Sequence, residues 1–209
     1  MDPTREQEQA LVSHCAHARY VWNLAVEQHG FWSRHRGGAP GCNAQSRQLT
    51  EARAEFDWLR AGSHTVQQQA VRDFAQALSN FFAGTHKRPT WRKQGVHEGF
   101  RQVGLKPHQV KRLSRKWGAV LVPKCGWVRF RLSRPVPEGV KSYRVTRDRV
   151  GRWHVAFAYI PDPVPGPGDG TVVGVDRGVT VSAALSTGDL LHVPGLTSGE
   201  KRRLRLLAR

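Results

Sequence analysis

A short apolar run that ends in aspartate is the feature of this sequence best suited to chemistry. Residues 171–175 are mostly β-branched, Asp176 follows them directly, and Gly178 comes two residues later. Such a run predicts a buried strand that presents one carboxylate at the edge of a sheet. Metal-dependent phosphodiester cleavage uses a carboxylate of this kind to hold one of two cations. Asp176 is therefore a candidate catalytic and metal-binding residue.

A two-metal site needs further carboxylates, and the 33 residues after Asp176 contain only two acidic residues. Asp189 falls in a predicted hairpin turn and Glu200 at the start of a predicted helix, so we expect neither to complete the site. We therefore expect an incomplete metal site, with one carboxylate ligand present and the others missing. The run by itself is also compatible with an actin-like ATPase, or with a plain turn after a buried strand.

The distribution of charge indicates a polyanionic partner. The 209 residues carry 33 Lys and Arg against 16 Asp and Glu, for a net charge of +17 and a pI near 11.1. Residues 61–160 hold 20 of the basic residues and only 4 of the acidic ones. A concentrated basic block attracts polyanions, so nucleic acid is the expected partner. A membrane surface is disfavoured because the block is not arranged as an amphipathic helix.

Several classes of protein and site are not expected. No segment approaches the roughly 18 apolar residues of a membrane span, and residues 1–6 do not resemble a signal peptide. The three cysteines, Cys15, Cys42 and Cys125, never form a C-x-x-C pair, which disfavours a zinc site or a disulfide framework. We expect them to be small core residues in a cytoplasmic protein.

Hydrophobic periodicity predicts three helices in residues 1–84. The first covers 4–35, with Thr4 and Gln7 as a capping box, and the second covers 44–60. A third begins at a cap formed by Thr65 with Gln68 and carries Phe81 and Phe82 toward a core. His14 and His17 lie one helical turn apart, but without a further ligand they indicate a partly exposed helix face.

The hydrophobic pattern changes after Gly84, where alternating apolar residues predict short strands. Five such runs lie near 99–105, 117–122, 126–132, 141–147 and 152–160. They predict a small barrel or a strongly twisted sheet in residues 85–160. Residues 161–170 form a Pro- and Gly-rich linker. Three strands over 171–176, 179–185 and 189–193 and a final basic helix capped by Thr197 or Ser198 complete an α+β chain.

Three groups of side chains are candidates for nucleic-acid binding. Basic residues around tryptophans on extended chain can contact phosphates and stack on bases. The first group is Lys87, Arg88, Trp91, Arg92 and Lys93, and the second is Lys106, Lys111, Arg112, Arg115, Lys116 and Trp117. The third is Gln68, Gln69 and Arg72, which we expect on the exposed side of the third helix, where amides could read an adenine edge. A solvated surface is the plain alternative for all three.

Taken together, these landmarks resemble the TnpB (OrfB) family of transposon-encoded, RNA-guided DNA endonucleases, which are related to Cas12 effectors. The resemblance rests on six segments that occur in the family's order through nearly the whole chain. They are Pro-Thr-Arg-Glu-Gln at 3–7, Ala-Arg-Tyr-Val-Trp-Asn at 18–23, Gln-Gln-Ala-Val-Arg-Asp at 68–73 with Phe-Phe at 81–82, the basic strip at 87–93, Gly-Arg-Trp-His-Val at 151–155 and Gly-Val-Asp-Arg-Gly-Val at 174–179.

The resemblance implies an architecture and a function. It implies a helical recognition lobe in 1–84 on a wedge-type β-barrel in 85–160, and the first strands of an RNase H-like (RuvC) nuclease domain in 171–209. It implies that the first two regions bind guide RNA and DNA. It also implies that Asp176 occupies the position of the first RuvC carboxylate, which holds Mg²⁺ in the family.

The chain departs from the family pattern in what it lacks. The later RuvC carboxylates, the zinc-binding insertion and most of the strand before residue 3 are missing, so the sequence resembles the front half of a TnpB protein. We expect nucleic-acid binding without cleavage by this chain alone, and a partly exposed apolar sheet. Two alternatives remain: a nuclease completed by a second chain, and a generic basic RNA-binding protein. A transposon remnant, a wrongly bounded gene and a retained regulator all fit the sequence.

Overall fold

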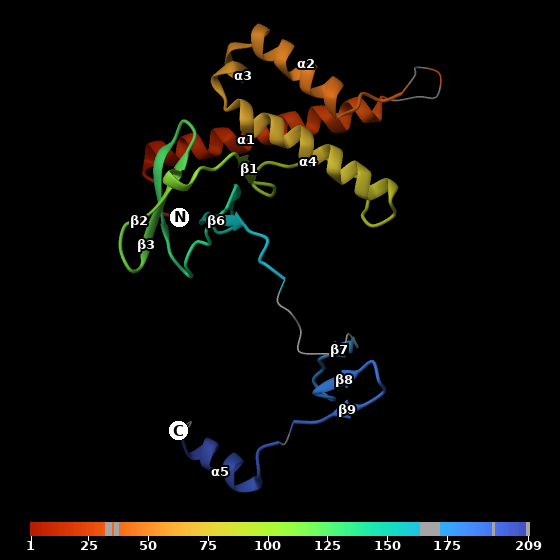
Figure 1. Ribbon diagram of the computed structural model, residues 1–209, viewed down its shortest axis with the longest axis vertical. Helices are drawn as coiled ribbons and strands as arrows, with labels where there is room; N and C mark the ends of the chain where they lie inside the picture. The colour runs from red at the N-terminus through yellow and green to blue at the C-terminus, as the bar shows by residue number, and fades with distance from the viewer. Residues whose placement is uncertain (32–34, 36–37, 164–171, 194, 208–209) are drawn as a thin grey trace. The chain divides into compact units, whose positions relative to one another are not determined.

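The chain divides into two compact units, Met1–Ile160 and Pro161–Arg209. The computed structural model describes residues 1–31, 35, 38–163, 172–193 and 195–207 (Figure 1). Most of the expected linker, from residue 164 on, lies outside the described residues. Among the described helices, none is long and apolar enough to cross a membrane.

The first helix confirms its predicted start. α1 covers Arg5–Gly30, and Thr4 and Gln7 form the reciprocal capping box that the sequence predicts. The helix ends at Gly30 and not at 35, with Phe31 as its C-cap. One face of α1 is buried in the middle of the helix, where its buried apolar side chains are Leu11, Cys15, Ala18, Val21, Trp22 and Ala25.

The single helix predicted over 44–60 is wrong, because the chain forms two helices there. α2 covers Cys42–Glu55 and α3 covers Asp57–Ala61, with Phe56 between them in an extended conformation (φ −106°, ψ 110°). The Arg53 guanidinium donates to the carbonyls of Leu59 (2.8 Å) and Gly62 (3.3 Å). These bonds tie α2 to the end of α3 and so favour the break between the two helices.

The third predicted helix is α4, His64–Phe82, and its predicted start and end need correction. Ser63, not Thr65, is the N-cap, and its hydroxyl accepts from the Val66 N–H at 3.5 Å. Phe82 was expected in the core, yet it is 76% exposed. It lies with Phe81 along an open groove at the C-terminal end of the helix, which Val26 and His29 of α1 also line.

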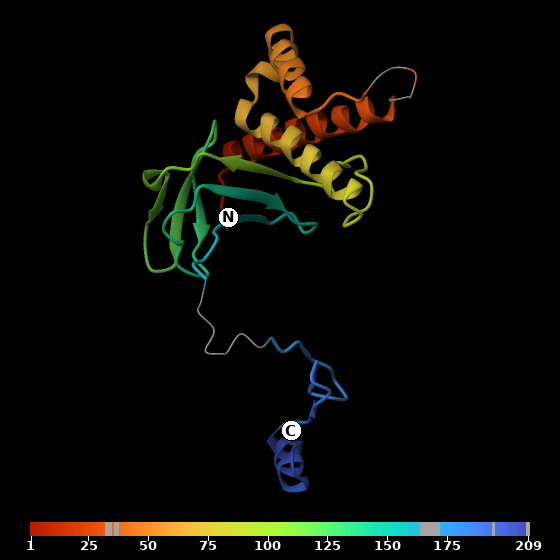
Figure 2. The ribbon, with the colours of Figure 1, turned by 45° about the vertical axis from the view of Figure 1, so that its right-hand side comes forward.

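Six strands form two antiparallel sheets in the first unit (Figure 2). The first sheet has the order β1-β5-β6, with β1 at Gly99–Val103, β5 at Ser142–Arg147 and β6 at Trp153–Ala158. The second has the order β2-β3-β4, with β2 at Val110–Arg112, β3 at Trp117–Val122 and β4 at Gly126–Arg131. The five predicted strands are confirmed, whereas β2 and the short 3₁₀ turn η1 at Pro107–Gln109 were not predicted.

The predicted barrel is wrong in one respect, because no ladder closes it among the described strands. The two sheets instead pack their apolar faces together. The ring centroids of Phe130 in β4 and Phe157 in β6 lie 5.4 Å apart. The Tyr143 hydroxyl of β5 donates to the Leu121 carbonyl of β3 at 3.1 Å. At the free edge of β4, the Asp2 N–H donates to the Arg129 carbonyl at 2.8 Å.

The helices and sheets of the first unit share one core. Leu11 of α1 and Ala70 of α4 belong to the same buried cluster as Phe100 of β1 and Val145 of β5. Ion pairs reinforce this junction, because Asp73 of α4 accepts from Arg101 of β1 at 2.8 Å and from Arg144 of β5 at 3.2 Å. The helical and β regions therefore pack as one unit. Both ends of the segment that joins α4 to β1, residues 83–98, are held by this packing.

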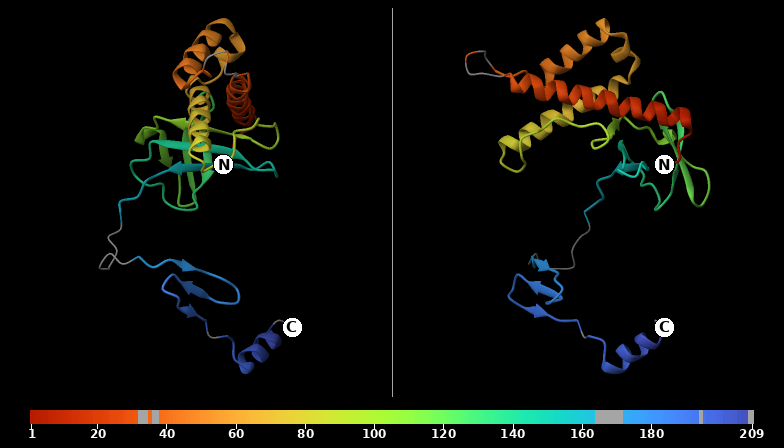
Figure 3. Two further views of the ribbon diagram at one scale, coloured as in Figure 1. Left: turned by 90° about the vertical axis from the view of Figure 1, so that its right-hand side faces the viewer. Right: turned by 180° about the vertical axis from the view of Figure 1, so that it is seen from behind.

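The second unit contains a short three-stranded meander and one helix (Figure 3). β7 (Val175–Asp176), β8 (Ala183–Leu185) and β9 (Leu190–Leu191) pair antiparallel in chain order, as predicted, although the strands are shorter than expected. α5 covers Ser198–Leu207 and is capped by Thr197, whose hydroxyl accepts from the Glu200 N–H. None of the described side chains in this unit is buried. An RNase H-like sheet is therefore not established here.

Candidate nucleic-acid interface

The basic strip, residues 87–93, is held in place by three side chains of α1. The Trp22 indole N–H donates to the Thr90 carbonyl at 2.8 Å. The Asn23 side chain brackets Arg92, donating to its carbonyl at 3.0 Å and accepting from its N–H at 2.7 Å. Arg19 pairs with Glu98, whose carboxylate also accepts from the Gly95 N–H at 2.7 Å. The strip and the turn that follows it are thus fixed to one helix.

This anchoring decides which residues of the strip point outward. The Arg92 side chain turns toward α1, so its neighbours on either side face away from the helix. Trp91 is 54% exposed, and Lys93 is also exposed. Lys87 and Arg88 lie on the exposed part of the strip before Thr90. As predicted, this segment is not helical, and it presents cations and an indole to solvent.

Arg92 has a different role from the one that we expected. Its guanidinium carbon lies 3.7 Å from the centroid of the Trp22 ring, which is the geometry of a cation–π contact. Burial lowers the pKa of Arg92 to about 10, while nearby Asp73 favours its charged form. Arg92 is half-buried and therefore holds the strip in place more than it offers a charge to a ligand.

The predicted set on the third helix is divided by the structure. Arg72 is exposed and Gln68 is half-buried, so both can reach a ligand. Gln69 was expected on the exposed side, but it is only 2% exposed and accepts a hydrogen bond from Arg101 at 2.8 Å. The α4 face that carries Gln69 packs on β1, so this amide joins the helix to the sheet and is not free to read a base.

The second basic cluster surrounds a pocket of about 770 Å³. Lys106 precedes η1, Lys111 and Arg112 lie on β2, and Arg115 lies in the turn before β3. All four line the pocket, whereas Lys116, although exposed, does not. The sequence therefore predicted the cluster, but not that its members meet around a cavity.

A further basic and aromatic face was missed by sequence reasoning. On the outer face of the β2-β3-β4 sheet, Lys111 Nζ lies 4.1 Å over the Trp127 ring, and Arg129 lies 4.7 Å over the Trp117 ring. Arg131 is exposed on the same strand as Trp127 and Arg129, at alternate positions. That period-two pattern, opposite the buried Val128 and Phe130, is the signal in the sequence that would have identified this face.

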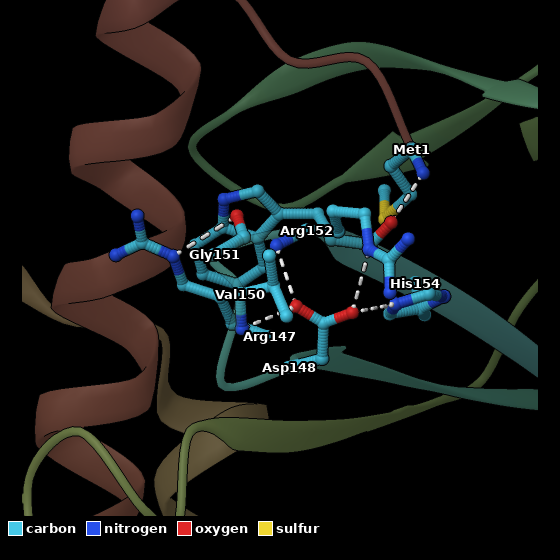
Figure 4. A network of polar contacts seen from close by, with 8 residues as sticks. Met1, Arg147, Asp148, Val150, Gly151, Arg152 and His154 are labelled. Carbon is cyan, nitrogen blue, oxygen red and sulfur yellow. Dashed lines mark hydrogen bonds and ion pairs between the residues drawn. The ribbon is translucent and has the colours of Figure 1, made fainter.

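The segment Gly-Arg-Trp-His-Val at 151–155 begins in the turn between β5 and β6 (Figure 4). The Asp148 carboxylate accepts from the backbone N–H groups of Val150 (3.0 Å) and Arg152 (2.8 Å). It also accepts from the Arg152 side chain and from His154, and these bonds hold the pKa of Asp148 well below its usual range. Gly151 takes a φ of +88°, which favours glycine. The role of this segment in the fold is thus to close a hairpin.

The candidate metal residue lies in the second unit. Asp176 is exposed on β7, in register with Ala184 of β8. Asp189 is in the hairpin turn, where it accepts from the Thr187 hydroxyl at 2.7 Å, and Glu200 caps α5. Among the described residues, no three His, Cys, Asp or Glu side chains gather as a metal site. The residues present therefore supply one candidate ligand and do not fit a two-metal site.

The two histidines considered as metal ligands, His14 and His17, and the three cysteines pack in or beside the core. His14 and His17 were expected on a partly exposed face, but both are buried. His14 Nε2 lies 2.7 Å from the Pro123 carbonyl, and the His17 ring stacks on Trp58. Burial raises the pKa of the Cys15 thiol to about 12, as expected for a core residue, while Cys42 and Cys125 lie at the margin of the core.

Comparison with known proteins adds the family. A family model described as a helix-turn-helix domain, of the OrfB type of IS605 elements, matches residues 1–32, where the described structure contains α1 as its one helix. A protein of Escherichia coli (strain K12) named "Putative RNA-guided DNA endonuclease InsQ" is 30% identical over 154 residues, 73% of this chain and 37% of that protein. A protein of Streptomyces pristinaespiralis named "Putative RNA-guided DNA endonuclease" is 30% identical over 211 positions, 97% of this chain and 50% of its own length.

These matches confirm the resemblance to the TnpB (OrfB) family. It spans about half the length of the Streptomyces relative and a smaller share of the other. Two TnpB-like segments of the sequence now have a joint explanation. The segment 18–23 supplies Arg19, Trp22 and Asn23, which hold the basic strip at 87–93. The two segments therefore form one structural unit, although about 70 residues separate them.

Proposed function

We propose that residues 1–160 bind guide RNA and DNA as the nucleic-acid-binding part of a TnpB-type RNA-guided DNA endonuclease. The observation that carries this proposal is the anchored strip. Trp22 and Asn23 fix its backbone, so that Lys87, Arg88, Trp91 and Lys93 face solvent. The names of the two relatives support the choice of guide RNA and DNA as the ligands.

The chemistry of the strip suits single-stranded nucleic acid. Lysine and arginine side chains neutralise phosphates and release counterions, and an exposed indole offers a face on which any base can stack. Because the backbone of the strip is already ordered, binding does not have to order it again, which lowers the free-energy cost of association. Arg72 and Gln68 on α4 are further proposed contacts, as are Lys106, Lys111, Arg112, Arg115 and Lys116.

We further propose that Asp176 is the first carboxylate of a RuvC-type nuclease site, and that residues 171–209 are the beginning of that domain. In such a site Asp176 would be one of the residues that hold Mg²⁺, and the ion would supply activation of water and stabilisation of negative charge. One carboxylate cannot fix two cations, and Asp189 and Glu200 are engaged elsewhere. The 209 residues are therefore proposed to bind nucleic acid without cutting it.

Two other functions would use the same surfaces. In the first, a second chain supplies the remaining carboxylates and the site cleaves DNA in trans; the exposed apolar side chains of β7 and β9, such as Val175 and Leu190, favour it. In the second, the chain is a generic basic RNA-binding protein. That function predicts equal affinity for any polyanion, because it depends on net charge alone.

The experiment that tests the proposal is to purify the chain and sequence the RNA that remains bound after a high-salt wash. The proposal predicts one defined, structured RNA, encoded close to the gene itself. A mixture of ribosomal and transfer RNA in proportion to its abundance would support the generic alternative. Metal-dependent DNA cleavage that appears only when a second chain is co-expressed would support the alternative in trans.

A further inference from the structure

The pocket surrounded by the second basic cluster lies where the two sheets of the first unit part. Its volume of about 770 Å³ falls in the roughly 300–1,000 Å³ range of ligand sites. Its lining includes a set of apolar side chains that belong to, or pack on, the common core. These are Leu105, Val110, Phe130, Leu132, Val136 and Val140.

One aromatic ring in this lining is placed by a glycine. A Cβ added to Gly118 of β3 would lie 2.8 Å from Phe130 Cζ, closer than real side chains approach. Gly118 therefore leaves room for the Phe130 ring, which is 4% exposed and belongs to the pocket lining. A ring in such a position offers an apolar surface on which a planar ligand can pack.

The rim of the pocket is basic, and its cationic side chains form no ion pairs within the described part of the chain. Lys106, Arg112, Arg115 and Arg134 line it, and Glu138 is the one carboxylate in the lining. Within the part of the chain that the structure describes, none of these four cations forms an ion pair. By contrast, Arg101 and Arg144, at the junction with the helices, are both paired with Asp73.

We propose that this pocket binds one unstacked nucleotide of a single-stranded RNA, with its base on the apolar floor and its phosphates on the basic rim. The inference deepens the proposed function and rests on it. An apolar floor disfavours a phosphate at the bottom of the pocket, and unpaired cations at the rim disfavour an apolar peptide as the occupant. A nucleotide satisfies both, since its base is a planar apolar surface and its phosphates are anionic.

Glu138 adds a preference among bases. A carboxylate accepts a hydrogen bond from an exocyclic amino group such as cytosine N4, whereas uracil presents a carbonyl oxygen at that position. We therefore expect the pocket to favour cytosine over uracil. Removal of the charge in Glu138→Gln should reduce that preference without a comparable loss of total affinity, because the rim cations remain.

The test uses the full chain and two 12-nucleotide probes, oligocytidine RNA and an abasic ribose-phosphate strand with the same number of phosphates. Ser133→Trp places an indole in the pocket from an exposed position of its lining. Arg115→Ala removes one rim cation. Arg149→Ala is the matched control, because Arg149 is exposed and does not line the pocket. Affinities are measured by fluorescence anisotropy at one salt concentration.

The wild-type chain is expected to prefer oligocytidine over the abasic strand by about tenfold or more, the effect of stacking one base. Ser133→Trp should reduce this preference by at least about threefold and leave affinity for the abasic strand unchanged. Arg115→Ala should weaken binding of both probes by about two- to fivefold, and Arg149→Ala by less than about twofold. Photo-crosslinking of wild-type protein to 5-iodocytidine RNA, which needs no variant, should label residues 130–138.

Other results would overturn the inference in distinguishable ways. If folded Ser133→Trp keeps the full preference, or if crosslinks fall only at Trp91, the pocket does not hold a base, although the proposed function stands. If Ser133→Trp changes self-association and not the RNA preference, the pocket holds a protein segment. If wild-type protein binds neither probe, the proposed function fails together with the inference.

Discussion

The guanidinium of Arg92 lies over the indole ring of Trp22, 3.7 Å from its centroid, while the same indole donates its N–H to the Thr90 carbonyl. A single side chain of α1 thus holds two residues of the basic strip. Asn23, the next residue of the helix, holds the backbone of Arg92 from both sides. The exposed charges of the strip therefore depend on buried contacts with a helix that is remote in sequence.

The first prediction concerns this anchor. Asn23→Ala removes both hydrogen bonds to Arg92 and should lower the affinity for single-stranded RNA by roughly three- to tenfold, because the strip must then be ordered on binding. The same change should lower the free energy of unfolding by about 1–2 kcal/mol, measured by urea denaturation. Asn43→Ala, at an exposed position of α2, is the control and should alter neither quantity.

The second prediction concerns stacking on Trp91. Because Trp91 is largely exposed, Trp91→Ala should change the unfolding free energy by less than about 0.5 kcal/mol. It should nevertheless lower RNA affinity by at least about fivefold, since stacking of one base contributes about 1–3 kcal/mol. Trp58→Ala should instead lower the unfolding free energy and leave RNA affinity unchanged. Trp58 packs on His17 and Tyr20, far from the strip in sequence. Equal affinity of wild type and Trp91→Ala would exclude this stacking role.

The third prediction is a loss of stability in mild acid. Burial lowers the pKa values of His14 and His17 below 6.5, and nearby Lys124 lowers them further, as does Arg53 for His17. The unfolded chain therefore binds protons first, and the free energy of unfolding should be highest above pH 6.5 and fall as the pH drops below it. Denaturation at pH 7.5 and 5.5 measures the effect. His14→Gln/His17→Gln should show a smaller difference between the two pH values; an unchanged difference would assign it to other groups.

The fourth prediction concerns the hairpin between β5 and β6. Asp148→Ala removes an acceptor of two backbone N–H groups and of the Arg152 and His154 side chains. It should lower the melting temperature clearly more than Arg149→Ala, which alters the neighbouring exposed residue without loss of a hydrogen bond found in the structure. Circular dichroism melts compare the two variants. Equal melting temperatures would mean that this network does not stabilise the turn.

The sequence was a good guide where one local rule decides the structure. The capping box of Thr4 and Gln7 and the alternation in residues 117–122 predicted α1 and β3 correctly. The break at Phe56 could not be predicted, because it depends on Arg53 reaching carbonyls in and just after the next helix. Phe82 looked like a core residue because its helix is apolar there, but tertiary packing leaves that face uncovered.

The candidate site shows the same division. Composition identified the basic strip and the second cluster, since charge is a property of the sequence itself. Composition could not distinguish Arg92, whose guanidinium packs on the Trp22 ring, from Lys93, which faces solvent. Gln69 was misplaced for a similar reason, because its partner Arg101 lies 32 residues away. The pocket was not visible at all, since its lining comes from β2, β4 and the loop after β4.

The salt dependence of RNA binding, measured with matched charge-removal variants, tests the central claim most directly. Lys87→Gln/Arg88→Gln/Lys93→Gln removes three cations of the strip, and Lys201→Gln/Arg202→Gln/Arg203→Gln removes three from the exposed helix α5. On single-stranded RNA, loss of three phosphate contacts should reduce the slope of log affinity against log salt by roughly 2. We predict that reduction for the strip variant and a much smaller one for the α5 variant. Equal reductions in both would contradict the account, because binding would then depend on total charge and not on the anchored strip.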